Sequence, residues 1–356
     1  MNTKRQVDFI IVGQGLAGSL LAFFLHKQGK KLLLVDPGRE DTASRVAAGI
    51  INPVTGRHYV KSWRIDEFLP FARQTYREME SLLGARFYSD RNVLRALFST
   101  VEENNWNAKL GDPGYAAYLL PKADPAEWPS MLQPVHAFGE LAGGAQVNLA
   151  RFLDSFRAWT AQNHNLLSDH FEYEDLDRSG EILRYKEWSA RAIVFCEGYS
   201  AKNNPYFAGL PYEGAKGDVF HISLPGPQPH KLLRHHLFLV PLEDGTYWAG
   251  SNYVWTYKDH LPAPEGKQWL TNQLGRILKA PYEILDHKAA IRPTVKDRRP
   301  LLGVHPTFSN VFIFNGLGTK GASQGPFFAR QMADFLNHNE ALDPEVDIRR
   351  FDAKTR

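Results

Sequence analysis

The first 36 residues contain two apolar runs with a glycine-rich segment after the first. Residues 7–12 are apolar and lead directly into Gly13 to Gly18, while residues 32–35 are apolar and end at Asp36. Between them, residues 19–27 carry apolar side chains at helical spacing. The pattern therefore predicts a strand, a helix and a second strand, which is the opening unit of a doubly wound parallel sheet.

The glycine spacing in this unit is that of a nucleotide-binding turn. Gly13 allows a tight strand-to-helix turn, Gly15 lets a pyrophosphate approach the backbone, and Gly18 lets helix and strand pack closely. The phosphates would lie at the helix N-terminus, where free amide groups favour anions. Asp36, about twenty residues further on, can accept hydrogen bonds from ribose hydroxyls. The motif predicts a bound dinucleotide and leaves NAD and FAD both open, and a glycine-rich turn beside a surface aspartate is the alternative.

The later chain alternates between helical and strand-like patterns. Apolar spacing predicts helices over residues 68–83, 148–162 with Asn148 as N-cap, 268–278 and 324–337. Strand-like segments are expected over residues 171–176, 182–185, 192–195 and 311–314, and alternation dominates residues 216–257. Residues 86–143 are rich in proline and aromatic side chains, which favours short strands of a separate layer.

These segments predict an α/β fold of two interleaved domains. We expect a Rossmann-like nucleotide-binding domain from residues 1–85, 144–213 and 291–356, and an antiparallel-sheet substrate domain, an α+β layer, from residues 86–143 and 214–290. A chain of 356 residues is long enough for two such cores.

Composition adds constraints on location and partners. Cys196 is the one cysteine, which excludes an intrachain disulfide and favours a cytoplasmic location, and we expect its side chain to be a small buried apolar group. The N-terminal segment, residues 1–6, does not resemble an export signal, and no stretch is long and apolar enough for a membrane span. The net charge of +3, without a basic run, does not favour nucleic-acid binding. His235 and His236 are adjacent, so on a strand they would point to opposite faces, and we expect no metal site.

Two segments near the C-terminus carry a family resemblance. The stretch Arg292-Pro293-Thr294-Val295-Lys296-Asp297-Arg298-Arg299-Pro300-Leu301-Leu302-Gly303 precedes an expected strand, and the turn Asn315-Gly316-Leu317-Gly318-Thr319-Lys320-Gly321 follows it. The sequence here resembles the D-amino acid oxidase family of FAD enzymes, which includes glycine oxidase and sarcosine oxidase. The resemblance covers most of the chain and is weakest over residues 86–143. Residues 316–327 are also similar to the oxidase domain of the bifunctional enzyme that modifies wobble uridine in tRNA.

The resemblance implies noncovalently bound FAD in a nucleotide domain of the glutathione-reductase type. The cofactor-binding residues it implies are Gly13, Gly15, Leu16, Ala17, Gly18, Asp36, Ser44, Arg45, Ala48, Gly49, Gly198, Gly316, Gly318, Thr319, Lys320 and Gly321. The last five lie before the final helix, whose N-terminus would stabilise the reduced flavin, with Ser323 as cap and Pro326 in the first turn. An ordinary helix cap is the alternative.

Arg292 matches the family arginine that holds the substrate carboxylate. A guanidinium suits this task because its planar fork donates two parallel hydrogen bonds to a carboxylate. The alternative is an interdomain salt bridge. We expect the neighbouring Lys296, Arg298 and Arg299 to lie in a solvated turn.

Two positions of the expected substrate pocket depart from glycine oxidase. Phe238 stands where that enzyme has a tyrosine, so a hydrogen bond to the substrate is lost, and Tyr253 replaces a methionine and could restore a hydroxyl from another direction. Glycine is therefore a doubtful substrate. Packing between sheet and helix is the alternative for both residues.

Together the residues and the resemblance predict an oxidoreductase with a small-molecule substrate. FAD would accept a hydride from the carbon of a C–N bond in an amino acid or N-substituted glycine, and water would hydrolyse the imine. Oxygen or an unknown acceptor would reoxidise the flavin, and the oligomeric state is left open. The alternatives are a tRNA-modification oxidase, although the chain lacks a methyltransferase portion and a strong basic face, and a non-catalytic flavin-binding protein.

Overall fold

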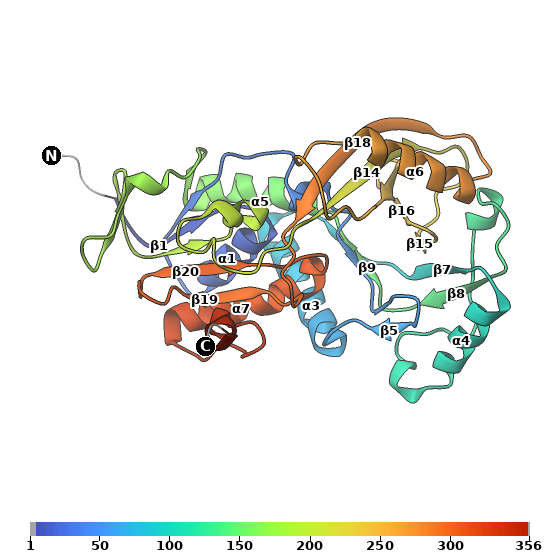
Figure 1. Ribbon diagram of the computed structural model, residues 1–356, viewed down its shortest axis with the longest axis horizontal. Coiled ribbons are helices and arrows are strands. Elements are labelled where there is room, and N and C mark those ends of the chain that lie inside the picture. Colours follow the sequence, from blue (N-terminus) through green and yellow to red (C-terminus); the bar gives the residue numbers. More distant parts are fainter. Residues whose placement is uncertain (1–4, 355–356) are drawn as a thin grey trace.

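A computed structural model describes residues 5–354 and contains two large sheets that lie end to end (Figure 1). The first sheet has eight strands in the order β10-β2-β1-β13-β12-β11, with β20 beside β13 and β19 beside β20. Its parallel strands are β1 (Arg5–Val12), β2 (Leu32–Val35), β10 (Asn165–Leu167), β13 (Trp188–Phe195) and β20 (Val311–Asn315). Its antiparallel strands are β11 (Leu176–Asp177), β12 (Leu183–Tyr185) and β19 (Leu301–Val304).

Both faces of the parallel sheet are buried, because successive residues of β1 enter two different apolar clusters. Phe9 and Ile11 pack into the cluster that includes the helices α1 (Leu16–Lys27), α5 (Leu149–Asn163) and α7 (Gly321–His338), whereas Ile10 and Val12 pack into a cluster on the other face. This alternation is what a strand with helices or loops on both sides requires. The helix α3 (Ile65–Leu83) packs on α7 and joins the first cluster.

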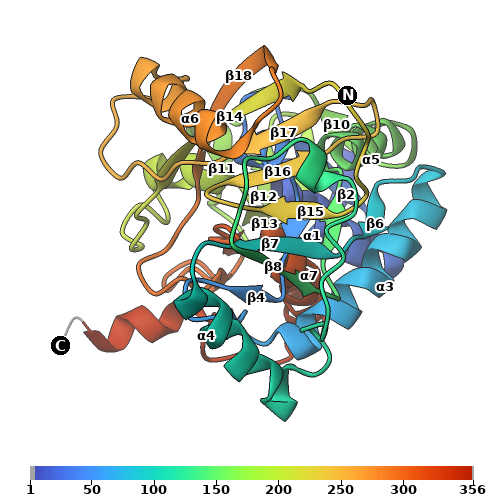
Figure 2. The same cartoon turned by 90° about the vertical axis from the view of Figure 1, so that its right-hand side faces the viewer.

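The second sheet has seven strands in the order β18-β14-β17-β16-β15-β7-β8. Its strands are β7 (Val93–Leu97), β8 (Ala137–Leu141), β14 (Ala215–Ser223), β15 (Leu232–Arg234), β16 (Phe238–Pro241), β17 (Tyr247–Gly250) and β18 (Glu283–Arg292). One face packs on α6 (Pro264–Ile277), which lies beside β14 and β18 in Figure 2 and buries Leu270 and Leu274. The opposite face is free to line a cavity.

Several short elements lie outside the two large sheets. They are α2 (Ala43–Val46), β3 (Ile50–Ile51), β4 (Val54–Thr55), β5 (Val60–Lys61), β6 (Tyr88–Asp90), α4 (Thr100–Leu110) and β9 (Ala145–Val147). Strand β9 pairs with both β3 and β6, so three distant segments form one small sheet.

The predicted α/β architecture is confirmed, with one mainly parallel and one mainly antiparallel sheet in which β7 and β15 pair in parallel, and several local details need correction. Helices α1, α3 and α7 each begin three residues earlier than expected, and α6 begins four residues earlier, at Pro264. Residues 171–176 were expected to be a strand but form a 3-10 turn over Tyr173–Asp175, with β11 starting at the last position. Residues 86–143 contain the unpredicted helix α4 in addition to strands. The predicted cap is confirmed, since the Asn148 side chain accepts a hydrogen bond from the Arg151 amide at 3.1 Å.

The two-domain division stays a prediction, and residues 1–4 of the segment tested for an export signal lie outside the described residues. Among the helices of residues 5–354, none has the length and apolarity needed to cross a membrane.

Candidate active site

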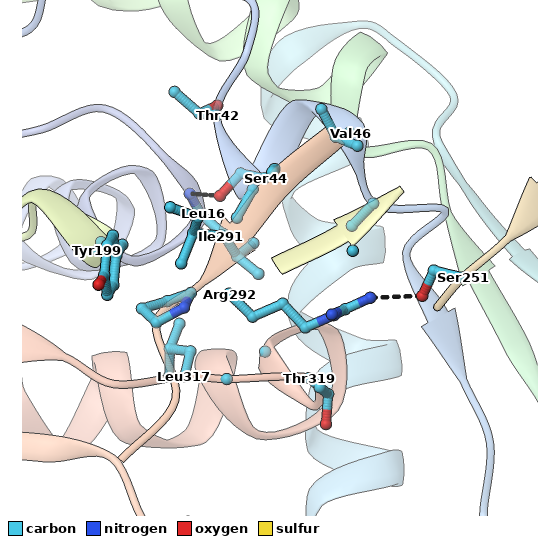
Figure 3. Close-up of a pocket in the computed structure, with 18 of the residues that line it drawn as sticks. Leu16, Thr42, Ser44, Val46, Tyr199, Ser251, Ile291, Arg292, Leu317 and Thr319 are labelled. Atoms are coloured by element: carbon cyan, nitrogen blue, oxygen red, sulfur yellow. Dashed lines mark hydrogen bonds between the residues drawn. The ribbon is translucent and has the colours of Figure 1, made fainter. Parts of the chain in front are cut away.

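A cavity of about 860 Å³ lies between the two sheets. The end of β1 and the start of α1 form one part of its lining, and the cavity-facing side of the antiparallel sheet forms another. Figure 3 shows Leu16 and Ser44 on one side, Leu317 and Thr319 on another, and Arg292 between them. Segments from the whole length of the chain therefore meet at one cavity.

At the end of β1, Gly13 and Gly18 lie so close to neighbouring backbone that a side chain would not fit. Gly13 has a φ of +96°, and a Cβ built there would lie 2.6 Å from the carbonyl oxygen of Cys196. A Cβ on Gly18 would lie 1.9 Å from the carbonyl oxygen of Gly13. Neither position tolerates a side chain, so the turn and the close approach of α1 to β1 both depend on glycine.

The first turn of α1 lines the cavity through Leu16 and Ala17, next to the N-cap residue Gly15. The Leu16 amide donates to Ser44 Oγ at 3.1 Å, and a Cβ on Gly15 would lie 3.2 Å from the same oxygen. Gly49 has a φ of +66° and packs so closely on β9 that a Cβ would meet the Val147 carbonyl oxygen at 1.9 Å. The N-terminus of α1 thus lies at the cavity, which is where an anion site would form, and its Leu16 amide is bonded to Ser44.

Asp36 lies at the cavity and is held by three donors. Its Oδ2 accepts from the Gln14 amide at 2.7 Å, and its Oδ1 accepts from the Gly38 amide at 2.7 Å and from Arg157 at 3.1 Å. Arg157 also donates to the Gln14 side chain at 3.0 Å. These contacts orient the carboxylate, and they bring in a residue of α5 that sequence reasoning did not identify.

The turn before α7 forms a further part of the cavity. Gly316 and Gly318 have φ values of +73° and +54°, which favour glycine, and Lys320 occupies the N-cap position. Burial lowers the pKa of Lys320 to about 8, and among the described residues its ammonium makes no ion pair. A cation whose charged form is destabilised by burial therefore lies at the cavity, beside a helix N-terminus.

The predicted cap of this last helix is wrong. Because α7 begins at Gly321, Ser323 lies inside the first turn, where its hydroxyl donates to the Lys320 carbonyl at 2.9 Å. Pro326 falls in the second turn rather than the first, so it cannot donate to the carbonyl of Ala322 four residues earlier. The Tyr76 hydroxyl donates to that carbonyl instead, at 3.0 Å.

Arg292 ends β18 and reaches into the cavity. Its guanidinium donates to the carbonyl of Ala215 at 3.1 Å and to the hydroxyl of Ser251, as Figure 3 shows. A Cβ on Gly217 would lie 2.1 Å from the guanidinium, so the glycine makes space for it. Burial lowers the pKa of Arg292, and it forms no ion pair with any carboxylate of residues 5–354. The interdomain salt bridge considered for this residue is therefore not found.

Phe238 and Tyr253 both line the same cavity as Arg292. The Tyr253 ring lies 4.2 Å from the Arg292 guanidinium carbon and is 56% exposed, so it is not part of a packed core. Phe238 is partly buried and lies 5.3 Å from the guanidinium carbon of Arg234.

Most predicted site residues meet at this one cavity. Those that line it are Gly13, Gly15, Leu16, Ala17, Asp36, Ser44, Ala48, Gly49, Gly198, Phe238, Tyr253, Arg292, Gly318, Thr319, Lys320 and Gly321. Gly18 and Gly316 lie behind the lining, where Gly18 packs on the Gly13 backbone and Gly316 packs on the side chains of Val295 and Leu301. Arg45 does not line the cavity, because its guanidinium pairs with Glu40 at 3.2 Å and with Asp154 at 2.5 Å.

The remaining residues considered from the sequence are Lys296, Arg298, Arg299 and Cys196, and their surroundings differ. Lys296 and Arg298 are exposed as expected, but Arg299 is half-buried, lies 3.8 Å above the Trp63 ring and pairs with Glu345. Cys196 is buried, and burial raises the pKa of its thiol.

The two adjacent histidines are not arranged as expected. His235 and His236 follow β15 instead of lying within a strand, and their ring centroids are 4.7 Å apart, so they do not point to opposite faces. Among residues 5–354, no cluster of three or more His, Cys, Asp or Glu side chains could hold a metal.

The donor set fits FAD. A helix N-terminus beside glycines that no Cβ could replace suits a pyrophosphate, Asp36 at the cavity suits a ribose, and the α7 turn supplies positive charge at a second place. The residues that sequence reasoning missed are Arg157, Arg95 and Arg234. Arg157 is 121 residues from Asp36, and no local pattern signals such a contact.

Comparisons with known proteins agree with this geometry. A family model described as FAD dependent oxidoreductase (DAO) matches residues 8–335. Glycine oxidase of Bacillus subtilis is 22% identical over 99% of this chain and 98% of that protein. The tRNA 5-methylaminomethyl-2-thiouridine biosynthesis bifunctional protein of Marinobacter nauticus is 23% identical over 91% of this chain and 54% of that protein. The crystal structure of glycine oxidase from Geobacillus kaustophilus matches with a TM-score of 0.78 and 18% identity, over 96% of this chain and 97% of that chain.

Proposed function

Because the chain belongs to the DAO family of FAD-dependent oxidoreductases, we propose that it oxidises the carbon–nitrogen bond of an amino acid or N-substituted glycine. Family membership confirms the predicted enzyme class and FAD as the cofactor. The observation that carries the proposed substrate class is Arg292, a partly buried guanidinium in the cavity without a carboxylate partner among the described residues.

Arg292 would bind the substrate carboxylate and orient the molecule. Its hydrogen bonds to Ala215 and Ser251 hold the guanidinium in place, and the Tyr253 ring supports one face. A fixed planar fork binds a carboxylate in one orientation, which places the neighbouring carbon reproducibly. Because burial lowers the pKa of Arg292, a bound anion would restore the stability of its charge.

The rest of the cavity would supply electrostatics and exclude water. Bound FAD supplies the acceptor for the two electrons and the hydrogen that leave the substrate carbon. The N-terminus of α7 and the Lys320 ammonium place positive charge at the cavity, where it would stabilise negative charge that develops during the reaction. Phe238 and Trp248 contribute apolar surface to the cavity wall.

We propose no protein base for this reaction. The amine would enter in its neutral form, so no side chain has to remove its proton, and water hydrolyses the imine product to a carbonyl compound and an amine. The residues of the chain then bind, orient and desolvate. We also propose noncovalent FAD, since Cys196 is buried behind the Gly13 turn and its thiol pKa is raised.

The test is anaerobic reduction of the bound flavin. Purified protein should show a flavin spectrum, and mixing with glycine, sarcosine, proline and D-amino acids without oxygen should bleach it for at least one of them. A colourless protein that takes up no added FAD would contradict the cofactor assignment. A flavoprotein that none of the carboxylated amines bleaches would contradict the substrate class.

A second candidate is oxidation of a carboxymethylaminomethyl group on tRNA. The match to the tRNA-modifying protein, at 23% identity over 91% of this chain, favours it. The chain matches only 54% of that protein, and its net charge of +3 is small for an RNA-binding surface. Bleaching by tRNA that carries this group, and not by free amino acids, would select this candidate.

A further inference from the structure

The cavity contains a second pair of arginines away from Arg292. Arg95 on β7 and Arg234 on β15 are direct partners in the parallel pairing of these strands. Arg234 is in turn the partner of Phe238 on β16, and Phe238 is the partner of Gly250 on β17. Partners across neighbouring strands point to the same face of a sheet. All four residues line the cavity, so both guanidinium groups belong to its wall.

Within the described part of the chain, neither arginine of this pair has a charged partner. No carboxylate of residues 5–354 forms an ion pair with Arg95 or Arg234. The Nε of Arg95 is buried without a hydrogen-bond partner among residues 5–354. Arg234 donates to the carbonyl oxygen of its own neighbour, His235. Aromatic rings support both guanidinium carbons, Tyr59 at 4.9 Å from Arg95 and Phe238 at 5.3 Å from Arg234.

The positive charge of Arg95 disfavours the charged form of Arg234. Burial lowers the pKa of Arg234 to about 10, and the charge of Arg95 adds to this shift. The charge of Arg234 also contributes to the lowered pKa values of His235 and His236. Glu102 is close enough to act on the pKa of His236, but its Oε2 accepts from the Phe98 amide at 2.8 Å. Buried like charges without a counter-ion are unfavourable unless a ligand supplies one.

The pair lies within reach of a small molecule held by Arg292. The Arg292 guanidinium lies against Gly217 on β14 and bonds Ser251 just beyond β17, whereas that of Arg234 lies against Phe238 on β16. Strand β17 is the neighbour of both β14 and β16. Across the sheet, one or two strand spacings of about 4.8 Å separate the two guanidinium groups. Along it, Gly217 lies two residues from Val219, which shares a row with Gly250 and Phe238, so the separation is on the order of 8 to 12 Å.

We propose that Arg95 and Arg234 form a second anion subsite, and that the substrate is an amine or amino acid with two acidic groups. One carboxylate would bind Arg292, and a second acidic group, a carboxylate or a phosphonate, would bind the arginine pair. This inference rests on the proposed function for the oxidation step. Dicarboxylate binding itself does not depend on that step, so the two can fail separately.

The experiment compares matched N-substituted glycines on the FAD-loaded enzyme. Iminodiacetate and N-(phosphonomethyl)glycine carry a second acidic group, and N-(carbamoylmethyl)glycine is the neutral amide of the first. We expect kcat/KM for at least one acidic compound to exceed that for the amide by about tenfold or more, as one charge-assisted contact provides. Arg234→Gln and Arg95→Gln should each reduce this ratio, while Lys267→Gln on the outer helix α6 should leave it unchanged.

A binding measurement separates this inference from the proposed function. Succinate and propionate differ by one carboxylate, and calorimetry on the FAD-loaded enzyme measures their affinities without turnover. Tighter binding of succinate, lost in Arg234→Gln, supports the subsite even if no amine reduces the flavin. Equal affinities, or a kcat/KM that favours the neutral amide in the wild type, overturn the subsite. If an arginine variant retains no FAD, these wild-type comparisons still decide.

Discussion

The two ends of the cavity treat their charged groups in opposite ways. At the β1 end, Asp36 is satisfied by two backbone amides and by Arg157. At the antiparallel sheet, Arg95, Arg234 and Arg292 face the cavity without a carboxylate partner among residues 5–354. A site whose charges are balanced before the ligand arrives serves as a rigid frame. A site whose charges are unbalanced depends on the ligand to complete it.

The two ends also select their ligands by different properties, by shape at the β1 end and by charge at the sheet end. At the β1 end, the glycines bring backbone segments so close together that no Cβ would fit. A ligand at this end must therefore be a group that binds against backbone amides. The sheet end depends on long cationic side chains, so its ligand must bring negative charge. Disruption of the first end should remove the cofactor, and disruption of the second should leave the cofactor in place and remove the substrate.

The largest effect is expected from Gly18→Ala. The new Cβ would lie 1.9 Å from the Gly13 carbonyl oxygen, and the overlap with backbone should cost about 3 kcal/mol or more and open the turn. The purified variant should carry little or no flavin by its visible absorbance and should unfold at a lower temperature. Gly275→Ala, which has open space around it in α6, is the matched control and should retain flavin. A Gly18→Ala protein with full flavin content would show that the turn is not the cofactor frame.

Arg292→Ala should have the next largest effect. Loss of one partner of a buried carboxylate–arginine pair costs about 2 to 5 kcal/mol, so kcat/KM for a carboxylated amine should fall by about 30-fold to several thousandfold. Arg292→Lys should keep only part of the wild-type kcat/KM, since an ammonium cannot donate two parallel hydrogen bonds to the carboxylate. Flavin content should stay near that of the wild type, as it should in the exposed control Lys296→Ala. Loss of flavin together with activity would place Arg292 in the cofactor frame instead.

Lys320→Met tests whether burial of an unpaired cation lowers the stability of the folded protein. Because burial lowers the pKa of Lys320 from 10.5 to about 8, the charged form is disfavoured in the folded protein. The penalty is fully present below pH 8 and is relieved as the pH rises from about 8 to 10.5, where the unfolded chain still binds the proton. In FAD-free protein, the variant should be more stable than the wild type at pH 7 by up to about 3 kcal/mol, and the difference should shrink toward pH 10. Thermal unfolding of both proteins at pH 7 and pH 10 measures this difference in stability. A difference that is the same at both pH values would contradict a buried charge on Lys320.

The smallest effect is expected from Arg157→Gln at the balanced end. Asp36 would keep the amides of Gln14 and Gly38 as donors, so the loss of one further hydrogen bond should weaken FAD binding by about tenfold or less. Fluorescence titration of FAD-free protein gives the dissociation constant. A loss of more than about a hundredfold would mean that Asp36 is held mainly by Arg157, and the contrast between the two ends would weaken.

The sequence predicts one end of the cavity far better than the other. The Gly13 to Gly18 turn and Asp36 are recognisable because turn, helix start and strand end are local features. Arg292 was identified through a family motif. Arg95 and Arg234 were missed because they become neighbours only through the pairing of β7 with β15, which no local pattern indicates. Helix α4 was missed since it buries only Trp106 and lacks an apolar face, and the start of α7 was misplaced because Gly321 and Gly325 weaken its helical pattern.

The central claim is that a carboxylate held by Arg292 positions the amine for oxidation. The most direct measurement is the rate of anaerobic flavin reduction by sarcosine and by dimethylamine, which lacks the carboxylate, in the wild type and in Arg292→Ala. We predict that the wild type is reduced at least about a hundredfold faster by sarcosine, and that the variant loses most of this preference. Equal rates with both amines in the wild type, or an undiminished preference in Arg292→Ala, would contradict the account.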